Sequence, residues 1–151
     1  MAVTIRRAGP DDWAVIVEFN LRLAAESEGK TLDRALLEPG VAAGLADERK
    51  ALYFVACEGE QVVGQMMITY EWSDWRNGWF WWVQSVYVRP EARRRGVFRA
   101  LFEHVVQLAR RDPEVIGLRL YVENGNRVAQ ETYACMGMIP AGYFVLEKYP
   151  L

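Results

Sequence analysis

The sequence contains 151 residues, a length that fits one domain, 1–151, with a well-buried core. Hydrophobic residues make up 52% of the chain and charged residues 25%, which is typical of a globular protein and too apolar for a disordered one. The formal net charge of −2 disfavours a general nucleic-acid binder, because such proteins are usually basic. No segment approaches the roughly 18 apolar residues of a membrane span, and no signal-peptide pattern opens the chain. We therefore expect a cytoplasmic protein with no membrane or nucleic-acid partner.

The two cysteines give no sign of a metal site. Cys57 and Cys135 lie far apart in the sequence and form no CxxC or other metal-ligand spacing. In a reducing cytosol such residues remain free thiols. The sequence therefore predicts neither a disulfide nor a bound metal.

The first half of the chain combines strand and helix patterns. A short strand over 3–7 precedes a helix that begins at Gly9-Pro10-Asp11-Asp12, because proline suits the first helical turn and acidic residues suit its positive dipole end. This helix is expected to reach about residue 27. The next elements are a second helix, interrupted near Pro39-Gly40, and two strands joined by a turn, predicted over 32–46, 52–57 and 62–70.

The second half continues with a long strand over 79–89, whose near-continuous apolar character indicates burial on both faces. A helix over 94–111 carries an apolar stripe, and a further helix over 127–136 ends at Gly137, a suitable C-cap. The remaining strands are predicted over 116–122 and 139–149. This order of elements predicts the α/β class, with an α+β arrangement in which a central mixed sheet is flanked by helices.

The most informative segment is the strand–loop–helix junction over 88–102. Three consecutive arginines, Arg93 to Arg95, precede Gly96 at the start of the helix. Free N–H groups at a helix N-terminus, the positive end of the helix dipole and arginine side chains together suit a pyrophosphate. The alternative is a solvated basic patch that binds nothing, as many charge runs are.

Residues 88–102 and 118–138 together resemble the GNAT superfamily of N-acetyltransferases. The family's acyl-CoA loop, Gln/Arg-x-x-Gly-x-Gly/Ala, corresponds to Arg93-Arg94-Arg95-Gly96-Val97-Phe98, in which Phe98 replaces a small residue. The family's second pattern, Asn-x-x-Ala-x-x-x-Tyr-x-x-x-Gly-Phe, corresponds to Asn126, Ala129, Tyr133, Gly137 and Met138. Two motifs in the right order within the right succession of elements are a specific signal.

The resemblance implies a GNAT-type acyl-CoA N-acyltransferase fold and acetyl-CoA as co-substrate, with no metal. It implies an enzyme that transfers acetyl to the primary amine of a small molecule, such as an amino acid or a polyamine-like compound, by direct attack in a ternary complex. The residues that would bind acetyl-CoA are Val86, Val88, Arg93, Arg94, Arg95, Gly96, Val97, Phe98, Arg99 and Asn126. Asn126 would cap its helix, contact CoA, or do both. The alternatives are a non-catalytic acyl-CoA-binding or sensor domain and a protein or peptide N-acetyltransferase.

The resemblance also assigns catalytic roles. A bulge in the 79–89 strand would place the Val86 N–H against the thioester carbonyl, where it steadies the oxyanion. Tyr133 would protonate the departing thiolate, although a tyrosine on a helix is more often a packing residue. The general base is missing, because Trp82 and Gln84 stand at the positions where relatives carry glutamates. A water chain or another carboxylate must serve; the candidates are Glu26, Glu28, Glu71 and Asp74.

The aromatic loop after the 62–70 strand is the candidate acceptor site. Trp72 and Trp75, with Asp74 nearby, offer aromatic faces and an acid to a cationic amine, and Arg76 suits a carboxylate. The further candidate substrate-binding residues are Glu28, Glu71 and Gln84. The same exposed aromatic residues equally suit the contact of a homodimer. His104, the only histidine, is interpreted as a surface residue of the 94–111 helix.

Overall fold

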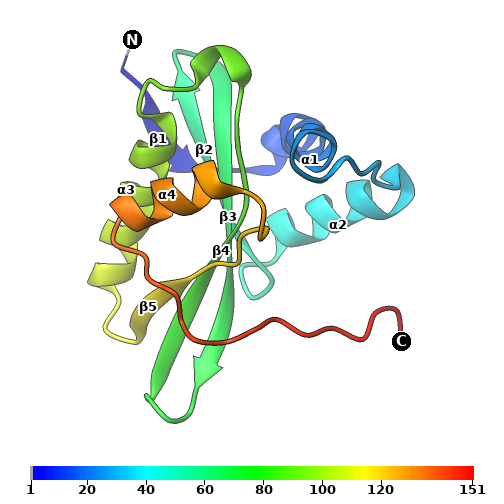
Figure 1. The fold of residues 1–151 in the computed structure, drawn as a ribbon. Helices are drawn as coiled ribbons and strands as arrows, with labels where there is room; N and C mark the ends of the chain where they lie inside the picture. The colour runs from blue at the N-terminus through cyan, green and yellow to red at the C-terminus, as the bar shows by residue number, and fades with distance from the viewer. Residues whose placement is uncertain (1) are drawn as a thin grey trace. The chain divides into compact units, whose positions relative to one another are not determined.

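A five-stranded sheet organises the chain up to Arg119 (Figure 1). The structure is a computed structural model, and it describes residues 2–151. The strands follow the order in which they occur in the chain; the first three neighbouring pairs are antiparallel, and the last pair is parallel. They are β1 (Thr4–Arg7), β2 (Leu52–Glu58), β3 (Gln61–Ser73), β4 (Gly78–Val88) and β5 (Val115–Arg119). The predicted mixed sheet is therefore confirmed.

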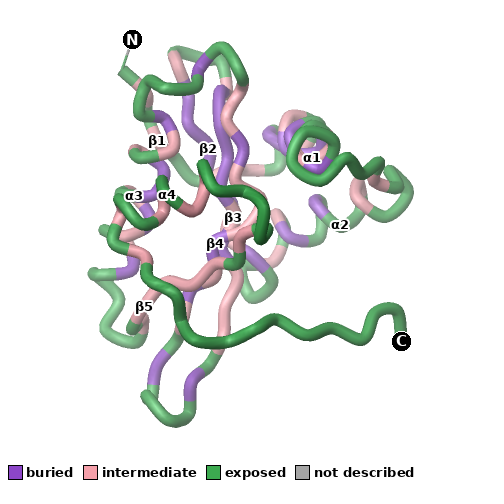
Figure 2. Tube along the Cα trace, in the orientation of Figure 1, coloured by how far each residue is buried: buried purple, intermediate pink, exposed green. Residues whose placement is uncertain are grey.

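Helices lie on both sides of this sheet, with α1 (Trp13–Glu28) and α2 (Arg34–Ala46) on one side and α3 (Val97–Arg111) on the other (Figure 1). Successive residues of β2 show why both faces are buried. Tyr53 packs in a cluster with Ile16 of α1, whereas the ring of Phe54 contacts the ring of His104 on α3 at 5.6 Å. Buried residues accordingly follow β2 and β3 (Figure 2). His104, interpreted from sequence as a surface residue, is half-buried by this contact.

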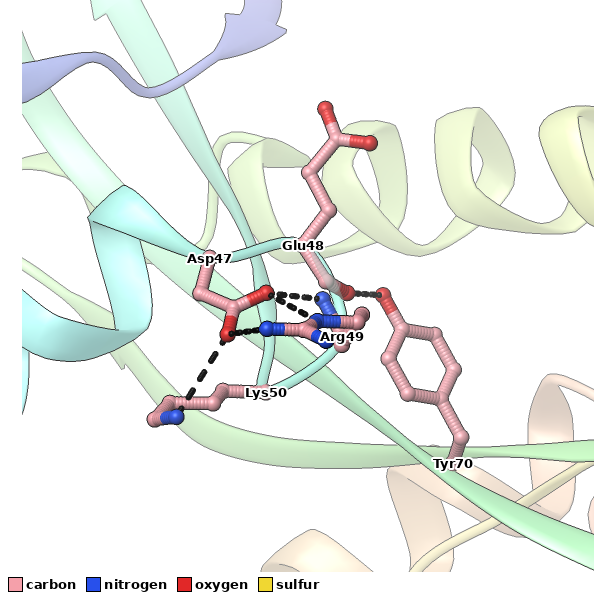
Figure 3. Close-up of polar contacts among 5 residues, drawn as sticks. All are labelled: Asp47, Glu48, Arg49, Lys50 and Tyr70. Atoms are coloured by element: carbon pink, nitrogen blue, oxygen red, sulfur yellow. Dashed lines mark hydrogen bonds and ion pairs between the residues drawn. The ribbon is translucent and has the colours of Figure 1, made fainter.

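A charged turn connects α2 to β2 (Figure 3). The Asp47 carboxylate accepts hydrogen bonds from the backbone N–H of Arg49 at 2.9 Å and from its guanidinium at 3.1 Å. Lys50 lies 3.4 Å from the same carboxylate. On β3, the Tyr70 hydroxyl donates to the backbone oxygen of Glu48 at 2.7 Å. The hydrogen bonds from Arg49 hold the pKa of Asp47 well below its ordinary value, so the turn keeps its charge.

Several predicted element bounds differ from the structure. Helix α2 runs without interruption through Pro39, and β5 ends at Arg119 rather than at residue 122. Helix α3 begins at Val97 rather than at residue 94, because Arg94 and Gly96 adopt left-handed backbone conformations that a helix does not accept.

The chain from Leu120 forms a second unit that contains α4 (Arg127–Cys135). The prediction of a strand over 139–149 was wrong: the segment is exposed and has no strand (Figure 2). The segment is rich in apolar residues, but Pro140 lacks an N–H and Gly142 has a φ of +83°, so a ladder of hydrogen bonds would be interrupted there. The organisation of 1–151 as one domain stays a prediction.

No helix within residues 2–151 is both long enough and apolar enough to cross a membrane.

The junction between β1 and α1 depends on a buried carboxylate, which generates a stability prediction. Asp12 is 6% exposed; it binds Arg6 through two hydrogen bonds of 2.8 Å and accepts the Gly9 N–H at 2.8 Å. We expect Asp12→Asn to lower the free energy of unfolding by about 2 kcal/mol, since hydrogen bonds to charged groups contribute on this order. Chemical denaturation at pH 7 measures the difference, and Asp11→Asn, at the exposed neighbouring position, is the matched control.

The same pair sets the pH dependence. The hydrogen bonds from Arg6 lower the pKa of Asp12, so its stabilising effect is present above the unfolded-state pKa of about 3.9 and is lost as the pH falls through the folded-state value. The stability difference between the wild type and Asp12→Asn should therefore shrink below about pH 4. A difference that stays constant from pH 7 to pH 3 would contradict this assignment.

Candidate functional site

A bulge interrupts β4 near its carboxyl end. In the register with β3, Gln65 pairs with Tyr87 and Met67 pairs with Gln84, so Met66 alone lies opposite both Ser85 and Val86. Ser85 has a φ of +51°, in the left-handed region that side-chain-bearing residues rarely adopt. The Gln65 Nε2 donates to the Ser85 backbone oxygen at 2.9 Å. The structure thus contains a bulge in β4, the strand in which the family resemblance implies one. The bulge includes Val86, the residue that the resemblance singles out.

The opposite edge of β4 is open over the same stretch. Strand β5 pairs with β4 only from Trp79 to Trp82, so within the five-stranded sheet the residues 83–88 have β3 as their single neighbour. An open strand edge presents backbone N–H and C=O groups that an extended ligand with amide groups can pair with. The open edge and the bulge fall on the same residues.

The loop that follows β4 combines two left-handed residues with a helix N-terminus. Arg94 has a φ of +62° and Gly96, the residue before α3, has a φ of +79°. Alternation of right- and left-handed residues turns successive N–H groups toward one concave side, which favours an anion. The first N–H groups of the 15-residue α3 have no intrahelical partner and add to this effect. The backbone of this loop is compatible with the predicted phosphate site, which stays a prediction.

Helix α3 lies close to the sheet at this end because β3 carries a glycine there. A Cβ on Gly64 would lie 3.1 Å from Val97 Cγ1 and 3.2 Å from the backbone oxygen of Tyr87. Val97 itself is 2% exposed, and the ring of Phe98 packs against that of Phe102 at 5.9 Å. The first turn of α3 is thus fixed against β3 and β4, which also fixes the direction of its N–H groups.

Two of the three consecutive arginines are held by carboxylates. Arg93 lies 2.9 Å from Glu26 of α1, and its Nε donates to the Val88 backbone oxygen at 2.8 Å. Arg95 lies 2.6 Å from Glu58 at the end of β2. These two contacts brace the loop from both sides.

Two arginines remain turned to solvent. Arg94 is exposed and has no ion pair or hydrogen bond among residues 2–151. Arg99, which is also exposed, lies 4.0 Å from Glu103 one turn along α3. Arg94 is therefore the arginine of this loop whose charge is available to a ligand.

Glu26 has a structural partner that sequence spacing could not reveal. Its carboxylate accepts a hydrogen bond of 2.5 Å from the hydroxyl of Tyr87, the β4 residue next to the bulge, and also contacts Arg93. These two hydrogen bonds lower the pKa of Glu26. A carboxylate with a lowered pKa is a weaker proton acceptor, so Glu26 connects α1 to the loop rather than acting as a base.

Glu71 is similarly occupied. Its carboxylate accepts a hydrogen bond from the Trp82 Nε1 at 2.8 Å and lies 3.0 Å from Arg119, whose guanidinium stacks 3.7 Å from the centre of the Phe80 ring. The hydrogen bond from Trp82, with the contact to Arg119, lowers the pKa of Glu71. This makes Glu71 a poor general base as well.

The other substrate candidates come from different elements: Gln84 from β4, Glu28 from the end of α1 and Asp74 from the turn between β3 and β4. Gln84 donates to the Thr69 hydroxyl at 2.5 Å, Glu28 pairs with Lys30 at 3.2 Å, and Asp74 accepts the N–H of Trp75 at 2.9 Å. Gln84 directly precedes the bulge.

The aromatic hairpin lies far from the bulge. Trp72 packs edge-on against Trp79 at 5.1 Å, and Trp75 is 86% exposed at the turn. Trp72 lies six positions from Met66 along β3, which is about 20 Å at the usual rise of a strand. The hypothesis that Trp72 and Trp75 line an acceptor pocket next to the bulge gains no support from this geometry.

In the second unit, Asn126 and Tyr133 occupy the two ends of α4. The Asn126 side-chain oxygen accepts the Ala129 N–H at 3.1 Å, which confirms its predicted capping role. Tyr133 is half-buried, and burial raises the pKa of its phenol above the ordinary value of about 10. A phenol is protonated at neutral pH, and the raised pKa makes it a weaker acid than an exposed tyrosine.

Residues 2–151 contain no group of three or more His, Cys, Asp or Glu side chains that could hold a metal ion. Both Cys57 and Cys135 are free thiols.

The chain is similar over nearly its whole length to a possible acetyltransferase and to a predicted acetyltransferase, both of solved structure. A possible acetyltransferase from Clostridium difficile 630 has a crystal structure that matches 100% of this chain and 99% of its own, with 46% identity and a TM-score of 0.93. A predicted acetyltransferase from Clostridium acetobutylicum, solved with acetyl-CoA, matches over 97% and 96% with a TM-score of 0.81; at 16% identity, this likeness shows the fold alone.

One curated relative matches a shorter part of this chain. The thialysine N-epsilon-acetyltransferase of Caenorhabditis elegans is 33% identical over 87 residues, which are 57% of this chain and 53% of that protein. The chain thus spans about half the length of this relative. The acetyltransferase (GNAT) family itself matches residues 17–138, a range that includes the bulged strand, the arginine–glycine loop and α4. The chain belongs to the acetyltransferase (GNAT) family.

Proposed function

We propose that the protein is an acetyl-CoA-dependent N-acetyltransferase that acts on the primary amine of a small molecule by direct attack in a ternary complex. The observation that carries this proposal is the continuity of three features along the chain: a bulge at Ser85–Val86, an open strand edge over 83–88, and a left-handed loop before α3. The bulge suits the thioester of acetyl-CoA, the open edge suits its pantetheine arm, and the loop suits its pyrophosphate. These three parts follow one another in the ligand in the same order.

The backbone of the loop suits the pyrophosphate of CoA. The N–H groups of Gly96, Val97 and Phe98 begin α3, where the helix dipole favours negative charge, and Arg94 adds a full positive charge. The pantetheine arm carries amide groups, which would pair with the open edge of 83–88 as an additional strand does. Phe98 contributes only its N–H, because its ring is packed on Phe102.

Acetyl-CoA supplies an acetyl group activated as a thioester. The N–H of Val86, at the bulge, would donate a hydrogen bond to the thioester carbonyl and favour attack by the amine. Tyr133, whose phenol is protonated at neutral pH, would donate the proton that the departing thiolate needs. Since Glu26 and Glu71 both have lowered pKa values, we assign neither as the general base, and water would accept the proton of the amine.

The small-molecule acceptor is supported by the similarity to an N-epsilon-acetyltransferase that acts on thialysine, an amino acid. Amino acids and polyamine-like amines are therefore the first acceptors to test. A protein or peptide acceptor and a sensor without catalysis are the alternatives that the experiments below separate. The cytoplasmic location and a homodimer contact through the aromatic hairpin stay predictions.

The uncommitted charge of Arg94 gives the first test of the proposal. We expect Arg94→Glu to raise the Kd for acetyl-CoA at least tenfold, because it replaces an attractive charge beside the pyrophosphate by a repulsive one. Isothermal titration measures the Kd, and Arg110→Glu, an exposed position in the last turn of the same helix, is the control for net charge. Equal weakening by both variants would mean that only overall charge matters, and no binding by the wild type would reject the proposal.

The role of Tyr133 gives the second test. We expect Tyr133→Phe to lower kcat about 100-fold or more, as loss of a general acid does, while the Kd for acetyl-CoA changes less than about threefold. Thiol release is measured with a panel of amino acids, polyamines and lysine-containing peptides, and Tyr143→Phe, at an exposed position, is the control.

The outcomes of this second test separate the alternatives. An unchanged kcat in Tyr133→Phe would contradict its role as the acid. A wild type that binds acetyl-CoA tightly but releases no thiol with any amine would instead favour the sensor. Turnover with peptides alone would replace the small-molecule acceptor by a protein one.

A further inference from the structure

Gln65 is a buried polar side chain in an otherwise apolar part of β3. It is 1% exposed and lies between Val63, which is 2% exposed, and Met66, which is fully buried. Its Oε1 is buried and accepts no hydrogen bond from residues 2–151. A buried amide oxygen without a partner costs free energy, so packing alone does not account for a glutamine at this position.

The other end of the same amide makes one specific contact. The Nε2 donates to the backbone oxygen of Ser85 at 2.9 Å, across the two strands. Ser85 is the left-handed residue of the bulge, and it has no partner in the register between β3 and β4. The side chain of Gln65 thus replaces the hydrogen bond that a regular ladder would have given to this carbonyl.

The chemistry of the contact fixes the orientation of the amide. A backbone carbonyl oxygen only accepts hydrogen bonds, so the amide must turn its NH₂ group toward Ser85 and its oxygen away. An apolar side chain of the same length would fill the space but leave the Ser85 oxygen without a donor. The unpartnered Oε1 is therefore the consequence of holding the bulge with an amide.

We propose that Gln65 is a positioning residue: by holding the Ser85 carbonyl it fixes the peptide that carries the Val86 N–H, the group that receives the thioester carbonyl of acetyl-CoA. This inference rests on the proposed function. Gln65 acts through the bulge alone, since the arginine–glycine loop has its own supports in Glu26 and Glu58. Loss of the amide should therefore disturb the carbonyl site while leaving the affinity for the rest of CoA largely intact.

The test compares Gln65→Met, which keeps the length and loses the donor, with Met66→Leu, a buried control that faces the same bulge without a polar group. Hydrogen exchange of the amides at 84–88 is measured in the ligand-free protein. Infrared difference spectra of acetyl-CoA labelled with ¹³C at the thioester carbonyl report its hydrogen bond in the complex. Isothermal titration gives the Kd.

In Gln65→Met we expect exchange at 84–88 to accelerate at least tenfold and the carbonyl stretch to move toward its value in free acetyl-CoA. The Kd should change less than about threefold, because the pyrophosphate contacts are retained. Met66→Leu should show neither spectroscopic change. Should Gln65→Met fail to fold, Gln65→Glu replaces it: above the pKa of the introduced carboxyl it cannot donate to Ser85 and should show the same changes.

Unchanged exchange and an unchanged carbonyl stretch in the variant overturn the inference. The same changes in Met66→Leu would also overturn it, because they would trace to core packing rather than to the amide. Failure of the proposed function is distinguishable: a wild type that binds no acetyl-CoA rejects that function, whereas the exchange of the ligand-free protein still decides whether Gln65 holds the bulge.

Discussion

The unequal pairing of β4 is the constraint on which the candidate site depends. On one side its register with β3 continues from Gly78 to Val88 with a single irregularity, and on the other its pairing with β5 ends at Trp82. Because β3 holds the full length of the strand, the far edge can stay open without loss of order. Open strand edges are a liability for association, and in the proposed function the pantetheine arm of acetyl-CoA would pair with this one.

The arginines of the loop differ in their surroundings: two are paired with carboxylates, and Arg94 faces solvent. Three adjacent arginines would repel one another, but Glu26 and Glu58 each hold one of them, so that part of the charge serves to brace the loop between α1 and β2. Exposed ion pairs of this kind stabilise weakly on their own, and their effect here is to fix geometry. The exposed Arg94 keeps a field that can act on an anion. Glu26 also connects to Tyr87, so the loop and the bulged strand share one support.

The sequence predicted the features that are local or periodic. The order of elements, the mixed sheet and the capping by Asn126 follow from apolar spacing and from short-range hydrogen bonds, and the bulge near Val86 follows from the family resemblance. The contacts of Glu26, Glu71 and Gln65 join residues that are 11 to 67 positions apart, and no spacing rule reports which carboxylate meets which arginine. The prediction of a strand over 139–149 failed for the opposite reason. Apolar residues favour a strand, but a strand also needs a neighbour to pair with, and the sequence does not specify one.

In the proposed reaction, one group must give a proton to the departing thiolate, and another must take a proton from the amine. The thiolate needs a donor, and the phenol of Tyr133 is protonated at neutral pH, although burial raises its pKa and so weakens it as an acid. The amine needs an acceptor, but the hydrogen bonds that make Glu26 and Glu71 structurally useful also lower their pKa values and weaken them as bases. Where water accepts the proton, as proposed, the acceptor amine must already be neutral, so the acidity of its ammonium group would contribute to selectivity.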